Sequence, residues 1–220
     1  MNRTDLISRI EEAGLIVIVR GIKNEYLIDT AEAMYAGGVR VLEITYSADG
    51  RVSDKDTADG IRALKAHFGD RMAIGAGTVL TTRQVELTAE AGGEFIISPD
   101  VNEEVIRATV AQGLVSIPGA LTPTEVQTAH RAGADFVKLF PITSLGASYV
   151  KAIRAPLSHI RFLAVGGVDE HNMKDYLAAG VKGFGIGSSI VNKGMIEAGN
   201  FDGVTKLSRT YIEALAEARK

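Results

Sequence analysis

The stretch "AEAMYAGGVRVLEITY" (residues 31–46) contains the unit from which most of the chain is built: a helical segment, a glycine stop and a short apolar strand. Glycine is favoured just beyond the last helical turn because it adopts a left-handed backbone without steric cost. The β-branched run after it is typical of a strand buried on both faces. Glycine stops of the same kind occur in "EAGGE", "AQGL", "RAGAD" and "AAGVK".

Short apolar runs of strand type recur eight times along the chain. They are residues 15–20, 41–46, 72–79, 95–100, 114–119, 136–141, 161–167 and 183–189. Eight compact strand–helix units predict a (β/α)8 TIM barrel, an α/β fold, with "TDLISRIEEAG" (residues 4–14) as an extra N-terminal helix. A doubly wound open sheet is the alternative, but it does not require eight similar units.

The composition limits the kind of protein. A chain of 220 residues with 46% hydrophobic content suits one barrel domain spanning residues 1–220. The net charge of -3, without a long run of one sign, argues against a nucleic-acid or anionic-membrane surface. Without cysteine, disulfides, thiolate zinc sites and cysteine nucleophiles are excluded. No signal-peptide core or bilayer-spanning run occurs, so we expect a cytoplasmic protein.

A single lysine interrupts the apolar run "FVKLFP" (residues 136–141), and a glutamate interrupts "VLEITY" (residues 41–46). Lys138 and Glu43 could form a structural ion pair, but burying two charges costs several kcal/mol each, so we interpret them as functional. Burial lowers the pKa of an amine, and the free amine attacks a carbonyl to give an iminium that stabilises charge on the neighbouring carbon. We therefore predict Lys138 as the nucleophile and Glu43 as the proton shuttle.

Other polar residues fall near the carboxyl ends of strands, where barrels of this type carry their sites. Arg20 ends the first apolar run, and Thr78 follows "GAG" in the third. The connection "SADGRVSDKDTADG" (residues 47–60) is long and polar, which suits either a lid or a tolerated surface insertion. Both residues and this loop are predicted to border the site.

Glycines follow the last two predicted strands, in "AVGGVD" (residues 164–169) and "GIGSS" (residues 185–189). In this fold, backbone N–H groups of these two loops commonly bind phosphate. Gly166, Gly167 and Gly187 are the candidates, and Ser188 either adds a hydroxyl donor or caps the next helix.

Metal and cofactor sites are not expected. The four histidines lack ligand spacing, and we interpret them as surface or packing residues: His67, His130, His159 and His171. The run "GAGT" lacks the glycine spacing of a dinucleotide fingerprint. The predicted chemistry thus rests on side chains alone.

With these motifs in order, the chain resembles the 2-keto-3-deoxy-6-phosphogluconate (KDPG) aldolase / 4-hydroxy-2-oxoglutarate (KHG) aldolase family. The likeness runs nearly end to end, through "GGVRVLEITY", "IGAGTVL", "FIISPD", "IPGALTPTE", "FVKLFP" and "GGV". The resemblance implies a class I aldolase on a (β/α)8 barrel that reversibly releases pyruvate from a small keto acid. It also implies a homotrimer.

By the same resemblance, Lys138 matches the Schiff-base lysine and Glu43 the general acid/base. Arg20 and Thr78 match positions that hold the pyruvate carboxylate, and the phosphate loops are matched by Gly166, Gly167, Gly187 and Ser188. The family often has an arginine where this chain has Ser47, which shifts carboxylate binding toward Arg20.

Two sequence motifs favour different substrate branches of the family. "AVGG" is similar to the branch acting on 2-dehydro-3-deoxy-6-phosphogalactonate, whereas "LEIT" is similar to the gluconate branch. The sequence slightly favours the phosphogluconate, with hydroxyoxoglutarate as an additional substrate. Other phosphate-binding barrels, such as ribulose-phosphate epimerases and thiamine-phosphate synthases, do not explain Lys138. A non-catalytic barrel that binds a phosphorylated metabolite is the alternative from another functional class.

Overall fold

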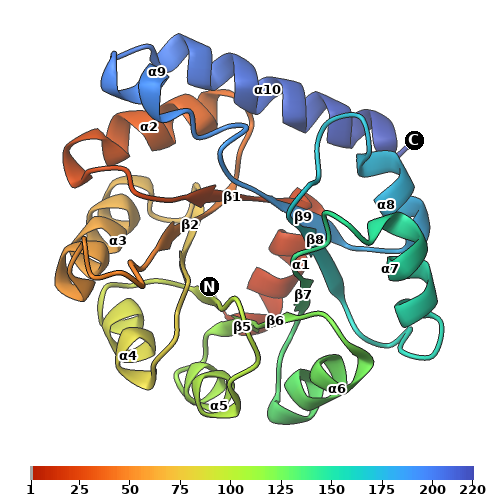
Figure 1. Cartoon of the computed structure of the whole chain (residues 1–220). Coiled ribbons are helices and arrows are strands. Elements are labelled where there is room, and N and C mark those ends of the chain that lie inside the picture. The colour runs from red at the N-terminus through yellow and green to blue at the C-terminus, as the bar shows by residue number, and fades with distance from the viewer. Residues whose placement is uncertain (1) are drawn as a thin grey trace.

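A computed structural model describes residues 2–220 and shows a ring of parallel strands surrounded by helices (Figure 1). The strands are β1 (Leu15–Val19), β2 (Val41–Thr45), β3 (Ala73–Gly77), β4 (Phe95–Ile97), β5 (Val115–Ile117), β6 (Gly119–Ala120), β7 (Val137–Leu139), β8 (Phe162–Val165) and β9 (Gly183–Ile186). The helices are α1 (Arg3–Ala13), α2 (Asn24–Ala36), α3 (Asp54–Phe68), α4 (Thr82–Glu90), α5 (Glu103–Ala111), α6 (Pro123–Ala132), α7 (Gly146–Arg154), α8 (Met173–Ala179), α9 (Lys193–Glu197) and α10 (Phe201–Ala218).

The strands form one sheet in the order β5-β4-β3-β2-β1-β9-β8-β7-β6. Its two end strands, β5 and β6, are successive pieces of one predicted run, separated by Pro118 alone. Proline has no N–H for the strand ladder, which explains the interruption. The Pro118 carbonyl accepts from the Lys138 N–H at 2.9 Å, so the chain itself closes the ring. The predicted TIM barrel is confirmed.

The stretch that defines the repeating unit folds as predicted. Residues 31–36 end α2, and Gly38 has a left-handed φ of 103° before β2 begins at Val41. The Val39 N–H donates to the Met34 carbonyl at 3.0 Å, which turns the chain back toward the barrel. All five residues of β2 are buried. The glycine stop therefore directs a buried strand into the sheet.

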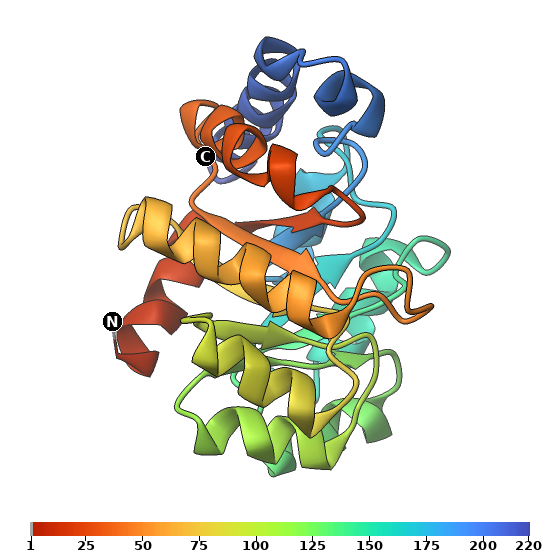
Figure 2. The same cartoon turned by 90° about the vertical axis from the view of Figure 1, so that its left-hand side faces the viewer.

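Two apolar layers hold the barrel together. A large cluster lies between the strands and the outer helices, and a smaller one fills the barrel interior. The smaller cluster includes Leu6 and Ile10 of α1 together with Phe95 and Phe136 from the strands. The predicted leading helix thus packs against the amino ends of the strands, on one side of the barrel (Figure 2). This leaves the carboxyl ends free to form a site.

The connection after β2 is shorter than the sequence predicts. Only residues 46–53 lie outside regular structure, because α3 already begins at Asp54. The Ser53 side chain accepts from the Asp56 N–H at 3.0 Å and caps the helix, and Asp54 and Asp56 suit its positive end. The prediction of a loop over residues 47–60 is wrong in its second half. No helix within residues 2–220 has the length and apolar character needed to cross a bilayer.

Candidate active site

Glu43 is the central residue of β2, and Lys138 is the central residue of β7. Side chains alternate between the two faces of a strand. Val41 and Phe136, each two residues earlier, belong to the cluster inside the barrel, so Glu43 and Lys138 also point inward. Their exposed fractions are only 2% and 8%. The two titratable groups that interrupt the apolar runs therefore meet inside the barrel.

Glu43 and Lys138 border the same small cavity of about 10 Å³. Its remaining walls are apolar: Ile16, Ile18, Ile97, Ile117, Leu163, Val165 and Gly185. Burial in these surroundings raises the pKa of Glu43 to about 7, and the charges of Lys138 and Arg20 only partly offset the increase. The Glu43 Oε2 atom has no hydrogen-bond partner within residues 2–220. A carboxyl group of this pKa both accepts and donates protons near neutral pH.

Lys138 has the properties of a lysine that can react as a free amine. Burial lowers its pKa; Glu43 opposes the shift, and Arg20 adds to it. The Nζ atom lies 4.4 Å from the ring centroid of Phe140, which is on the same face of the strand. Desolvation is the largest cause of the lowered pKa, and it favours the neutral amine over the ammonium form.

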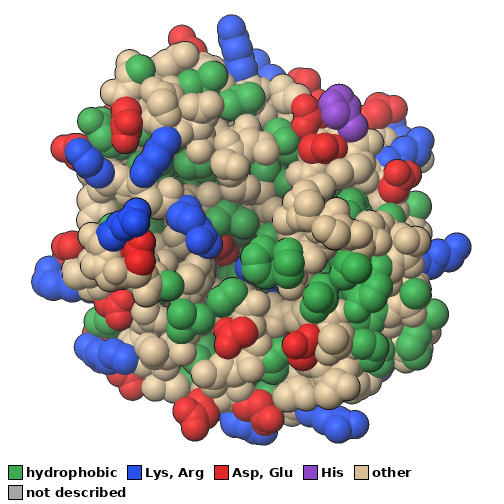
Figure 3. All heavy atoms as spheres, viewed as in Figure 1, with side chains coloured by type: hydrophobic (Ala, Val, Ile, Leu, Met, Phe, Trp, Pro, Cys, Tyr) green, Lys and Arg blue, Asp and Glu red, His purple; other side chains and the backbone are tan. Residues whose placement is uncertain are grey.

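A larger pocket of about 680 Å³ opens above this cavity at the carboxyl ends of the strands. Ile18, Val165 and Gly185 line both spaces, so the buried pair lies directly beneath the pocket. Figure 3 shows this face of the molecule, with hydrophobic, basic and acidic side chains around its centre. The pocket contains five of the predicted residues: Arg20, Gly166, Gly167, Gly187 and Ser188.

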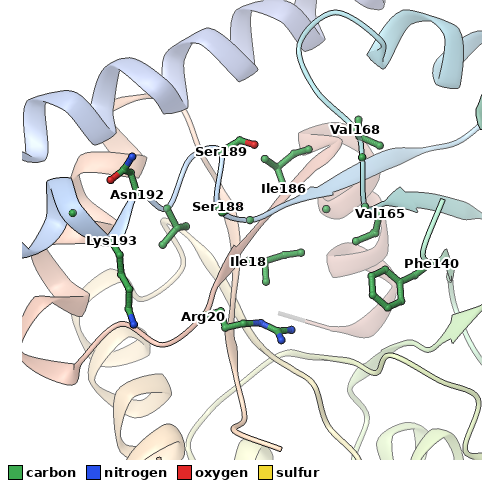
Figure 4. Close-up of a pocket in the computed structure, with 16 residues that line it drawn as sticks. Ile18, Arg20, Phe140, Val165, Val168, Ile186, Ser188, Ser189, Asn192 and Lys193 are labelled. Carbon is green, nitrogen blue, oxygen red and sulfur yellow. The ribbon is translucent and has the colours of Figure 1, made fainter. Parts of the chain in front are cut away.

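Arg20 connects the pocket to Thr78. Its Nη2 donates to the Thr78 Oγ1 at 3.1 Å, and Figure 4 shows the guanidinium extending toward Phe140. Thr78 has a φ of 55°, an unfavourable conformation for a β-branched residue that costs about 1–3 kcal/mol. The hydrogen bond fixes the threonine hydroxyl beside a cation, which suits the binding of a carboxylate.

The two glycine loops, which follow β8 and β9, form another wall of the pocket. Gly166 and Gly167 have φ values of 90° and 74°, where a side chain would be strained. The N–H groups of Gly167, Val168 and Ser188 donate to no main-chain carbonyl within residues 2–220. Free N–H groups in loops that line a pocket are suited to a multiply charged oxyanion.

The alternative role of Ser188 as a helix cap is wrong, because Asn192 caps α9 and accepts from the Met195 N–H at 3.0 Å. A second asparagine supports the other loop: the Asn172 Nδ2 donates to the Gly167 carbonyl at 2.9 Å. Sequence reasoning missed both Asn172 and Phe140. The two-residue spacing of Phe140 from Lys138 was a signal that could have identified it.

The histidines do not converge on the pocket. His130 and His159 contact each other with ring centroids 5.0 Å apart, and His67 pairs with Glu32 at 2.6 Å. No group of three His, Cys, Asp or Glu side chains in the described part of the chain has the arrangement of a metal site. That the chemistry needs no metal stays a prediction.

A buried lysine and glutamate beneath a pocket lined by free N–H groups, at the carboxyl end of a (β/α)8 barrel, suit an aldolase-type enzyme. Residues 6–207 match the family model described as "Aldolase: KDPG and KHG aldolase". The chain belongs to the KDPG and KHG aldolase family and is a lyase, which confirms the resemblance drawn from the sequence.

Two relatives and one solved structure illustrate the similarity. A probable 2-dehydro-3-deoxy-6-phosphogalactonate aldolase of Rhizobium meliloti (strain 1021) is 42% identical, with 84% of each chain covered. The KHG/KDPG aldolase of Escherichia coli (strain K12) is 36% identical, covering 90% of this chain and 89% of that protein. The structure of KDPG aldolase from Legionella pneumophila, with pyruvate captured as a covalent carbinolamine, has a TM-score of 0.83 and 29% identity, covering 93% and 97%.

Proposed function

We propose that this protein is a class I aldolase that cleaves a 2-keto-3-deoxy-6-phospho sugar acid to pyruvate and glyceraldehyde 3-phosphate. The observation that carries the proposal is the pairing of Lys138 and Glu43 in one apolar cavity beneath a pocket with free N–H groups. The carbinolamine of pyruvate in the Legionella relative supports the same chemistry.

In the proposed reaction, the neutral amine of Lys138 attacks the C2 carbonyl. The carbinolamine takes a proton from the carboxylic acid of Glu43 and loses water to give an iminium, which leaves Glu43 ionised. The ionised Glu43 carboxylate then takes the proton of the C4 hydroxyl as the C3–C4 bond breaks. The bonding electrons move into the iminium to form an enamine, and the aldehyde leaves. Glu43 returns its proton to C3, and hydrolysis restores Lys138 and releases pyruvate.

The substrate is held at both ends in this proposal. Arg20 and Thr78 bind the carboxylate beside C2, and the loops at Gly167 and Ser188 bind the distal phosphate. The phosphate lies far from the reacting carbons, so its binding energy positions the keto group against Lys138. A phosphorylated sugar acid should therefore react more efficiently than hydroxyoxoglutarate, which carries a carboxylate at that end.

Between the two phosphorylated epimers, we favour the galactonate form, although the sequence motifs slightly favour the gluconate form. The relative that is 42% identical is a probable phosphogalactonate aldolase. Val165 belongs to the "AVGG" segment that is similar to the galactonate branch, and it lines both the pocket and the cavity of the reactive pair. Values of kcat/KM measured side by side for both epimers and for hydroxyoxoglutarate decide the substrate.

Borohydride reduction in the presence of pyruvate tests the mechanism. We expect the protein mass to rise by one reduced pyruvyl group that maps to Lys138, and Lys138→Ala to lose both the adduct and turnover. Lys182→Ala, which changes an exposed lysine just before β9, is the matched control. An adduct on another lysine, or no adduct, contradicts the Schiff-base mechanism and favours a non-catalytic binding protein.

A further inference from the structure

A second pocket of about 540 Å³ lies beside the catalytic pocket, over the carboxyl ends of β1, β2 and β3. Three cations line it: Arg20, Arg51 and Lys193. Arg20 and Lys193 also line the catalytic pocket, so the two spaces adjoin each other. The proposed cleavage uses the glycine loops of the catalytic pocket for the phosphate. Of the residues that line the second pocket, it uses only Arg20 and Thr78, which bind the keto-acid carboxylate.

The charges in this second pocket are not balanced. Its only acidic residue among those described is Asp49, which pairs with the Arg51 Nε at 2.9 Å. The Arg20 and Lys193 side chains pair with no carboxylate within residues 2–220. Three positive charges against one negative charge leave a net charge of +2, which complements a dianion.

Hydroxyl groups and side-chain directions also suit an anion at this place. Thr45 is only 8% exposed, yet its hydroxyl makes no hydrogen bond within the described chain although it borders the pocket. Figure 4 shows the Lys193 side chain pointing away from Ser188. Its Nζ lies near Gly21, at 3.4 Å from the position that a Cβ atom would take there. Gly21 lines the second pocket but not the catalytic pocket. Lys193 thus extends toward the second pocket rather than toward the glycine loops.

We propose that this second pocket binds the phosphate monoester of a small metabolite, held by Lys193, Arg51 and Arg20 with the hydroxyl of Thr45. Together these groups neutralise a dianion and satisfy its oxygens. The proposal rests on the proposed function in one respect only, because Arg20 is also assigned to the keto-acid carboxylate. Since one guanidinium cannot serve both anions fully, a phosphate ester in this pocket weakens the binding of pyruvate.

Direct binding provides a test that is independent of turnover. Glycerol phosphate, which lacks a carbonyl, is titrated calorimetrically into Ser188→Asp protein, in which the glycine loops repel phosphate. We expect residual binding whose Kd rises about 10-fold or more on adding Lys193→Ala or Arg51→Ala, as expected for the loss of a charge-assisted hydrogen bond. Adding Lys182→Ala should leave the Kd unchanged. If no residual binding is found, or if Lys193→Ala does not weaken it, the proposal is overturned.

Competition with pyruvate tests the shared use of Arg20. Deuterium exchange into the pyruvate methyl group needs Lys138 and Glu43 but no phosphate loop. We expect glycerol phosphate to raise the KM for pyruvate in this exchange, and to do so less in the Lys193→Ala protein. Inorganic phosphate, tested in parallel, distinguishes recognition of the free anion from that of the ester. Inhibition equal in wild-type and Lys193→Ala protein overturns the proposal. A failed exchange reaction without added anion contradicts the proposed function instead.

Discussion

The carboxylate of Glu43 lies in the space that a Cβ atom at Gly77 would occupy. Gly77 ends β3, beside β2, and adopts an ordinary strand conformation, so its missing side chain matters for space rather than for backbone freedom. Gly75, two residues earlier, is crowded in a different way, by the ring and the carbonyl of Phe95. Gly77 therefore leaves room for the carboxylate of Glu43, whereas Gly75 leaves room for Phe95 in the packed interior.

We expect Gly77→Ala to keep the fold but to lower turnover strongly, because the flexible end of Glu43 moves away from the new methyl group. Gly75→Ala should instead lower the free energy of unfolding, since the Phe95 backbone cannot move aside. Thermal unfolding and kcat, measured for both variants, separate the two effects. Normal kcat in the Gly77→Ala protein contradicts a role for the position of Glu43.

Glu43→Gln should lower kcat by about 10²- to 10⁴-fold with a much smaller change in KM, because the amide keeps the shape but cannot exchange protons. The borohydride adduct of pyruvate at Lys138 should still form, although slowly. Steady-state kinetics of cleavage check this expectation. If turnover is normal, Glu43 is only a charge partner of Lys138 and another base must act.

The same substitution should change how stability depends on pH. Folding raises the pKa of Glu43 from 4.5 to about 7, so the folded state holds this proton more tightly than the unfolded state does. Wild-type stability should fall by about 2–3 kcal/mol as the pH rises from about 4.5 through 7, whereas Glu43→Gln should lose less. Urea unfolding at several pH values measures the two slopes. Parallel curves contradict the raised pKa.

Ser188→Asp should penalise phosphorylated substrates far more than pyruvate, because it places like charge against the distal phosphate. We expect kcat/KM for the phospho sugar acid to fall by about 100-fold, with pyruvate exchange much less affected. Ser158→Asp, an exposed serine outside both pockets, makes the same charge change as a control. Equal losses with both substrates contradict phosphate binding at the loop.

The family resemblance leads us to expect a homotrimer. The exposed large hydrophobic residues within the described chain are Val52, Leu80 and Leu145, and each follows the carboxyl end of a strand. Light scattering at micromolar concentration should report three chains per particle. A stable monomer refutes the expectation.

Much of the fold and part of the site could be predicted from residues close together in sequence. Recurring glycine stops and β-branched runs predict the barrel because each unit is specified locally. Lys138 and Glu43 are recognisable because a charge inside an apolar run is unusual whatever surrounds it. The end of the loop after β2 was missed, since "SDKD" suits both a polar loop and a capped helix start.

The amino-acid sequence by itself determined the order of the units, the strand lysine and glutamate, and the glycines that follow the last two strands. Only the tertiary structure decided that Glu43 and Lys138 share one cavity, that Gly77 makes room for the carboxylate, and that Lys193 lies beside the loop after β2. These relationships join residues far apart in sequence, and closure of the barrel sets their distances. Local patterns specify which groups are present, whereas the curvature and register of the closed sheet determine which groups meet.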